Sequence, residues 1–145
     1  MRRYIEMFLA LAFLVYGLIR LGVGSALLGQ EIGLIDFTVF HEPLHDIRNF
    51  LLKSDERLII PVSVAGYVSY IAVMGLVLAS GALRTLKNGP HGLSLIGAFL
   101  GMYALLFVNF QTINPKIIHL GVCLVMFILL FWLKTGHKTA VNPVA

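Results

Sequence analysis

The residues whose types and spacing could do chemistry begin with the pentapeptide 41–45, His-Glu-Pro-Leu-His. It matches the H-E-x-x-H pattern, in which two histidines one helical turn apart bind zinc and the glutamate activates the metal-bound water. Proline fits only the first turn of a helix, so we expect this helix to begin at about Glu42, leaving His41 outside it. A zinc hydrolase would also need a third ligand. The simpler interpretations are a pair of solvated loop histidines or a bare metal site of His41, His45 and Asp46.

Arg20 is a second chemical signal, because it interrupts an otherwise apolar run. An arginine at the centre of a bilayer costs about 2.5–3.5 kcal/mol, so it usually faces a partner or a cavity. Near the end of a helix it can instead extend to the lipid headgroups. Tyr16 lies one helical turn earlier and could share its face. Both interpretations of Arg20 stay open at this stage.

Polar residues also occur near the expected outer ends of the other apolar stretches, and Ser63 is one of them. We predict that they gather with Arg20 into a polar pocket that faces the outer side of the membrane. Such a pocket could hold a quinone or a lipid, since these ligands need an apolar cleft and few polar contacts. Haem held by two helix histidines is disfavoured, because only one histidine lies within a membrane segment. The predicted ligand-binding residues are Arg20, Tyr67, Asn109, Gln111 and His119.

The composition requires these residues to be positioned by membrane helices. Of 145 residues, 59% are hydrophobic and 12% are charged, against about a quarter charged in soluble domains. The mean hydropathy is +0.90. The formal net charge is +4, but the basic residues lie at the ends of apolar segments. There they orient the chain in a bilayer, so the charge does not indicate nucleic-acid binding. The single cysteine excludes an internal disulfide.

Four stretches reach the length of about 20 apolar residues that a bilayer crossing needs. Backbone groups in hydrocarbon must bond within their own segment, so we predict an all-α bundle of four transmembrane helices in a single domain. The first apolar run continues without a small-x-small cleavage site, so we expect it to be retained as a signal anchor. The predicted helices cover residues 4–28, 59–83, 93–110 and 117–133.

The first loop, residues 30–58, is long and charged. Leu44, Ile47, Leu51 and Leu58 recur at helical spacing between charged residues, which predicts a short amphipathic helix over residues 43–57. This helix would cover the outer end of the bundle.

Charge placement predicts the orientation of the chain. Six of the seven acidic residues lie in the first loop, which we expect to face outward. Short segments on the other side carry basic residues, which mark the cytoplasmic side, so both chain ends should be cytoplasmic. These basic residues are Arg2, Arg3, Arg84, Lys87, Lys134 and Lys138.

Small residues four apart let membrane helices approach closely. Gly75 with Ala79, and Gly97 with Gly101, have this spacing. Each pair could form a contact inside one bundle or a face between two copies of the chain.

Within residues 8–21 the apolar run ends in Gly17, and Arg20 follows shortly after it; the run 75–84 is bounded by glycines and closes with Arg84. These two stretches resemble DoxX-like membrane proteins. The resemblance implies a small bacterial inner-membrane protein of four helices, in a family with some members linked to sulfur-compound or quinone redox systems. The loop 31–57 has no counterpart in that pattern.

Three functional hypotheses follow. The first is a non-enzymatic accessory protein or subunit that binds a partner or a small apolar ligand at its outer face, as a homo-oligomer or within a larger membrane complex. It is favoured because no complete catalytic set occurs. The second is a quinone-linked redox subunit, and the third is a zinc-dependent hydrolase using His41, Glu42 and His45.

Overall fold

A computed structural model describes residues 1–111 and 115–136. Within these residues the chain forms five α-helices and two short 3-10 helices, and no strand. Four of the described helices, α1, α3, α4 and α5, are long and apolar enough to cross a bilayer. This confirms the predicted all-α bundle with a short helix in the first loop. The elements are α1 (Arg2–Glu31), η1 (Thr38–Phe40), α2 (His41–Ser54), η2 (Asp55–Arg57), α3 (Val64–Leu86), α4 (Gly92–Phe110) and α5 (Ile117–Thr135).

The largest difference from the predicted bounds is at the start of α3. The apolar run begins at Ile59, but the helix begins only at Val64. Pro61 has no backbone N–H to donate and disfavours a helical residue before it. Ser63 then caps the helix, since its hydroxyl accepts a 3.1 Å hydrogen bond from the backbone N–H of Gly66. Residues 59–63 therefore form a non-helical apolar segment.

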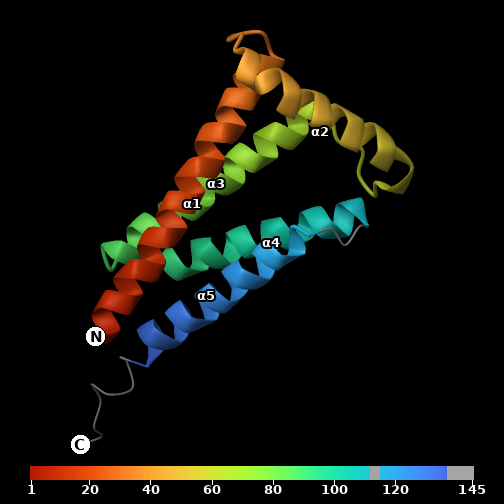
Figure 1. The fold of residues 1–145 in the computed structure, drawn as a ribbon. Helices are drawn as coiled ribbons and strands as arrows, with labels where there is room; N and C mark the ends of the chain where they lie inside the picture. Colours follow the sequence, from red (N-terminus) through yellow and green to blue (C-terminus); the bar gives the residue numbers. More distant parts are fainter. Residues whose placement is uncertain (112–114, 137–145) are drawn as a thin grey trace, which may run out of the picture.

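The closest helix contact joins α1 and α3, which lie side by side and antiparallel (Figure 1). A Cβ built on Gly17 would lie 2.6 Å from the backbone nitrogen of Ala79. A Cβ on Gly24 would lie 2.7 Å from that of Ala72. Gly75 meets the backbone of α1 in the same way, so Gly75 and Ala79 form a contact inside one chain. The two backbones approach as closely as small residues allow.

Gly101 has no such neighbour. A Cβ added there would meet nothing within 4 Å, and a Cβ on Gly97 would make an ordinary 3.5 Å contact with Phe127. The second pair of small residues therefore does not fix the approach of two helices within this chain.

The helix α4 joins α3 through another close approach and carries α5 on its other side. A Cβ on Gly92 would lie 2.7 Å from the backbone nitrogen of Thr85. The shared core of the bundle contains fully buried Phe13, Met74 and Phe99. The pair α1/α3 and the helix α4 lie close together at the end that carries the N-terminus, and they diverge toward α2 (Figure 1). We call these two ends of the bundle the narrow end and the wide end.

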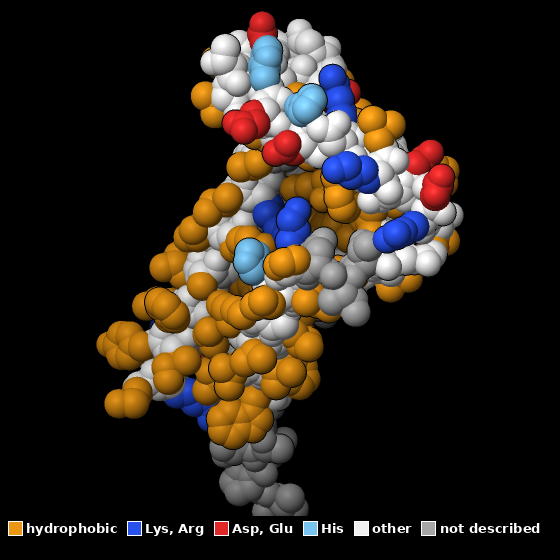
Figure 2. All heavy atoms as spheres, turned by 45° about the vertical axis from the view of Figure 1, so that its right-hand side comes forward, with side chains coloured by type: hydrophobic (Ala, Val, Ile, Leu, Met, Phe, Trp, Pro, Cys, Tyr) orange, Lys and Arg blue, Asp and Glu red, His pale blue; other side chains and the backbone are white. Residues whose placement is uncertain are grey.

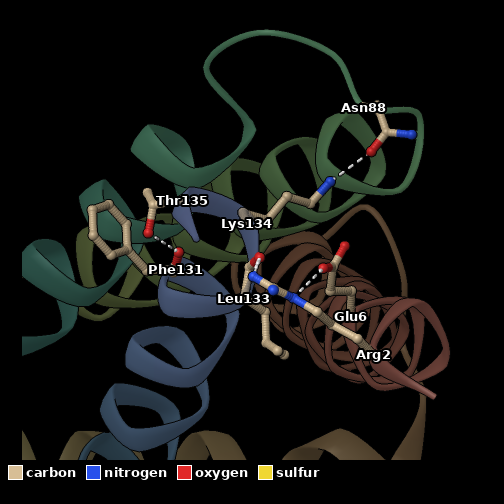
Figure 3. Close-up of polar contacts among 7 residues, drawn as sticks. All are labelled: Arg2, Glu6, Asn88, Phe131, Leu133, Lys134 and Thr135. Atoms are coloured by element: carbon tan, nitrogen blue, oxygen red, sulfur yellow. Dashed lines mark hydrogen bonds and ion pairs between the residues drawn. The ribbon is translucent and has the colours of Figure 1, made fainter. Parts of the chain in front are cut away.

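Polar contacts fasten the narrow end of the bundle (Figure 3). The Arg2 guanidinium donates to the backbone carbonyl of Leu133 and lies 3.7 Å from the Glu6 carboxylate. The Lys134 ammonium donates to the carbonyl of Thr85 at 3.0 Å and to the Asn88 side chain at 2.7 Å. The first and last helices are thus joined directly. Lys138, which the sequence placed at this end, lies outside the described residues.

The helix α2 crosses the wide end of the bundle. Its buried Leu44 packs with Leu27 of α1 and Val68 of α3, as expected for an amphipathic helix. Phe50 contacts Phe110, the last residue of α4, with ring centroids 5.0 Å apart. Acidic and histidine side chains gather on this part of the surface (Figure 2). The first loop therefore forms a roof over the bundle.

The close contact of α1 and α3 generates a prediction about stability. Gly17→Val should lower the free energy of unfolding by about 1–3 kcal/mol or more, because the added methyls meet backbone that cannot yield. Gly101→Val is the matched control and should change it little. Thermal unfolding in detergent measures both, and equal stability of the two variants would contradict the glycine contact.

Candidate functional site

Arg20 lies at the level of the middle of α3. A Cβ built on Gly75, the twelfth of the 23 residues of α3, would lie 2.9 Å from the carbonyl carbon of Arg20. The sequence placed Arg20 near the outer ends of the helices. It lies deeper because α1 is 30 residues long and continues for eleven residues beyond it, up to the roof. Of the two interpretations of Arg20, this position favours a partner or a cavity over extension to the lipid headgroups.

Three aromatic rings surround the Arg20 guanidinium. Its central carbon lies 4.3 Å from the ring centroid of Tyr103, 4.9 Å from that of Tyr16 and 5.6 Å from that of Phe99. One terminal nitrogen donates a 2.8 Å hydrogen bond to the Tyr16 hydroxyl. Aromatic faces attract a cation, more strongly where water is excluded. We call these three rings the aromatic cage.

The cage leaves the hydrogen bonding of Arg20 incomplete. The Nε–H is buried and has no hydrogen-bond partner among residues 1–111 and 115–136. Within the described part of the chain no ion pair joins Arg20 to a carboxylate. The acids of its own helix, Glu6 and Glu31, lie about 21 Å and 16 Å away along the axis. They pair instead with Arg2 and Arg48, at 3.7 Å and 2.7 Å.

An apolar groove adjoins the cage between α1 and α5. Its volume is about 250 Å³, and Tyr16 connects it to Arg20. His119 and the thiol of Cys123, one helical turn apart on α5, also face it. Below we call it the α1/α5 groove. Its lining residues are Ala12, Phe13, Tyr16, His119, Val122, Cys123 and Met126.

The helix α5 begins close to Tyr103 of α4. The hydroxyl of Tyr103 donates a 3.5 Å hydrogen bond to the carbonyl of Lys116, which caps the start of α5. From Tyr103, α4 continues for seven residues toward α2, about 10 Å, while α5 goes no further. Figure 2 shows a hollow below α2 with a hydrophobic inner wall and with basic and histidine side chains gathered at its lower edge.

The predicted pocket residues divide into two groups. Tyr67 packs its ring edge-on to Phe110 and lies within electrostatic range of Arg20, and His119 shares the groove with Tyr16. Asn109 instead holds the non-helical segment before α3: it accepts a 2.8 Å bond from the N–H of Ile60 and donates a 3.1 Å bond to its carbonyl.

Gln111 is exposed at the end of α4, with φ +49°. In residues 1–111 and 115–136, neither Asn109 nor Gln111 forms a hydrogen bond with Arg20. The aromatic pair Phe99 and Tyr103 was missed from the sequence. Its only signal was a spacing of four residues on one helix.

The loop histidines have separate partners. The α2 helix begins at His41, one residue earlier than expected, so Pro43 lies in its first turn and the two histidines are one turn apart. His41 Nε2 lies 2.7 Å from an Asp36 carboxylate oxygen, whereas His45 Nδ1 lies 3.1 Å from the Asn49 amide nitrogen. In residues 1–111 and 115–136 no three His, Cys, Asp or Glu side chains are grouped to hold a metal ion. Asp46 is exposed and does not join the histidines into such a group.

Comparison with protein-family models, with curated proteins and with solved structures finds no match for this chain.

The contact between Asp36 and His41 generates a prediction about ionisation. Hydrogen bonds from His41 and then from the Gln30 amide hold the pKa of the Asp36 carboxyl below its ordinary value. His41→Ala should therefore raise this pKa toward the ordinary value, whereas His45→Ala should leave it unchanged. A carboxyl-carbon NMR titration of Asp36 measures both.

The sign of the pH effect follows from the direction of this shift. Because the pKa of Asp36 is lower in the folded protein, its ionised carboxylate stabilises the loop at pH values above the ordinary pKa of an aspartate. This contribution is lost as the pH falls through the lowered pKa of Asp36. An unchanged Asp36 pKa in the His41→Ala variant would contradict the contact.

Proposed function

We propose that this protein is a non-enzymatic accessory protein of a membrane, which binds a small amphipathic ligand in the α1/α5 groove with its polar head at Arg20. The observation that carries the proposal is the incomplete bonding of Arg20: a cation within the membrane-spanning helices, with a buried N–H that no group of the described residues accepts. Polar groups left unpaired in a bilayer are costly and usually serve function.

The groove supplies the second half of such a site. Its lining is mainly aliphatic and aromatic, and its polar groups include the hydroxyl of Tyr16, which belongs to the cage, and the ring of His119. Ligand sites in proteins commonly combine an apolar cleft with a few placed polar groups. A volume of about 250 Å³ suits one narrow chain better than a bulky ring system.

The roof favours entry from the outer side of the membrane. The hollow beneath α2 leads toward the level of Arg20, where α5 begins. At the opposite end, Arg2 and Lys134 fasten the helices together. A ligand would therefore approach from the bilayer or from the outer surface.

A quinone is a second candidate ligand. The observation that favours it is that Tyr16 and His119, two groups able to donate to a quinone carbonyl, face one apolar groove. The protein would then be a quinone-linked subunit, which agrees with the resemblance to DoxX-like proteins. From the same resemblance we propose that the protein lies in a bacterial inner membrane.

The orientation is proposed from charge. Arg2, Arg3, Arg84, Lys87 and Lys134 lie at the narrow end of the bundle, with Glu6 as its one acidic residue in the described chain. The other six acids lie in the roof and its connections. The positive-inside rule then places the narrow end in the cytoplasm.

Ligand retention tests the site. The protein is purified from native membranes in a mild detergent, and bound small molecules are extracted and compared by mass spectrometry. We expect the amount of each small molecule that co-purifies with the wild type to fall severalfold in two variants. Arg20→Leu removes the polar anchor, and Val122→Trp fills the groove.

Val125→Trp is the matched control, since Val122 and Val125 lie on the same helix and are 53% and 57% exposed, but only Val122 lines the groove. The proposal fails if all four proteins, at equal abundance, carry the same set of molecules.

Thiol labelling tests the orientation. In a Cys123→Ser background, we expect a membrane-impermeant maleimide to label a Lys53→Cys variant in intact cells. A Lys87→Cys variant should react only after permeabilisation, because both positions are exposed but lie at opposite ends of the bundle. The reverse pattern would overturn the orientation.

A further inference from the structure

We infer that the head of the ligand is an anion, a carboxylate or a phosphate on a single apolar chain, bound by the Arg20 guanidinium. The inference rests on the proposed function, since it names the chemical class that the same groove would hold.

The first argument is charge. Arginine stays protonated in proteins, so Arg20 carries its charge whatever its surroundings. Away from the helix ends it is the one Lys or Arg within α1, α3, α4 and α5 as described. The aromatic cage stabilises this cation without neutralising it. In a medium of low dielectric constant, an anion beside it gains more than it would in water.

The second argument is hydrogen bonding. A guanidinium has five N–H donors in one plane, and carboxylate and phosphate oxygens match them in pairs. Ring faces attract the charge but accept only weak hydrogen bonds. Of the described partners of Arg20, the Tyr16 hydroxyl accepts one bond at 2.8 Å, and the buried Nε–H has none. An acceptor with two oxygens would complete the set.

The third argument is what the site lacks. Among the residues that the structure describes, no acidic one lines the α1/α5 groove. The two acids at the α1–α2 connection that could approach from the roof are already paired, Glu31 with Arg48 and Asp36 with His41. The field at the head of the groove is therefore positive, which favours an anionic amphiphile and opposes a cationic one.

Defined amphiphiles of one chain length test this inference. The wild-type protein is placed in nanodiscs of zwitterionic lipid, and saturable binding of radiolabelled laurate is measured. Unlabelled dodecyl phosphate, dodecanol, dodecyltrimethylammonium and inorganic phosphate are the competitors. Laurate and dodecyl phosphate should compete at least about tenfold better than dodecanol, the ratio expected for a hydrogen bond to a charged group. Dodecyltrimethylammonium should be the weakest amphiphile.

Variants locate the effect. Arg20→Gln should reduce the affinity for laurate to that for dodecanol, and Arg20→Lys should keep a preference for the anion. Val122→Trp should weaken every amphiphile, and Val125→Trp none. The comparison of laurate with dodecanol on the wild type needs no variant, so it stands even if Arg20→Gln does not fold.

The outcomes separate the two proposals. Equal competition by dodecanol and laurate overturns the anionic head but leaves an amphipathic ligand. Competition by inorganic phosphate as strong as that by dodecyl phosphate shows that the apolar chain adds nothing, which overturns the amphiphile and assigns the site to a free anion. Absence of saturable binding both for laurate and, in a parallel measurement, for radiolabelled dodecanol overturns the proposed function as well.

Discussion

The backbone contact between α1 and α3 is the constraint on which the rest of the structure depends. Gly17, Gly24 and Gly75 remove the side chains that would hold the two helices apart. In lipid the hydrophobic effect does not drive helices together, so close van der Waals contact supplies much of the attraction. Because the contact has one register, it also determines the level of every other residue on α1. Arg20 is held beside the middle of α3, facing α4, by this register.

The aromatic cage offsets part of the free-energy cost of placing Arg20 at that position. An arginine near the centre of a bilayer costs about 2.5–3.5 kcal/mol on insertion scales. A single desolvated cation–π contact contributes up to about 2 kcal/mol, so three rings offset much of this cost. The cage thus makes Arg20 tolerable while leaving its charge and one N–H available. A hydrophobic residue would be simpler at this position if packing were its only role.

The sequence predicted the elements better than the site. Long apolar runs and the basic residues at their ends specify four helices, because hydrocarbon admits few other structures. The start of α3 was misplaced by five residues, since hydropathy does not distinguish a helix from the apolar segment before it, although Pro61 and Ser63 mark the boundary.

The full set of residues around Arg20 could not be predicted from the sequence, because it depends on how the helices pack. Arg20, Tyr67 and His119 were singled out in the sequence because polar residues in apolar runs are conspicuous, and their role as ligand-binding residues stays a prediction. Phe99 and Tyr103 are ordinary in such a helix, and only the register of α4 against α1 turns them toward Arg20. Asn109 was grouped with Arg20 because both are polar. Its two bonds to Ile60 give it a structural role at the start of α3.

The fastening of α5 to α1 by Arg2 and Leu133 has a consequence for biosynthesis. The chain enters the membrane from its N-terminus, so α1 can meet α3 as soon as the third of the five helices has been made. The groove beside Arg20 has α5 as its second wall, and α5 leaves the ribosome after the other helices. Until α5 is in place, the side of α1 that carries Tyr16 borders lipid, and a chain stopped after α4 would hold a stable helix pair but no groove.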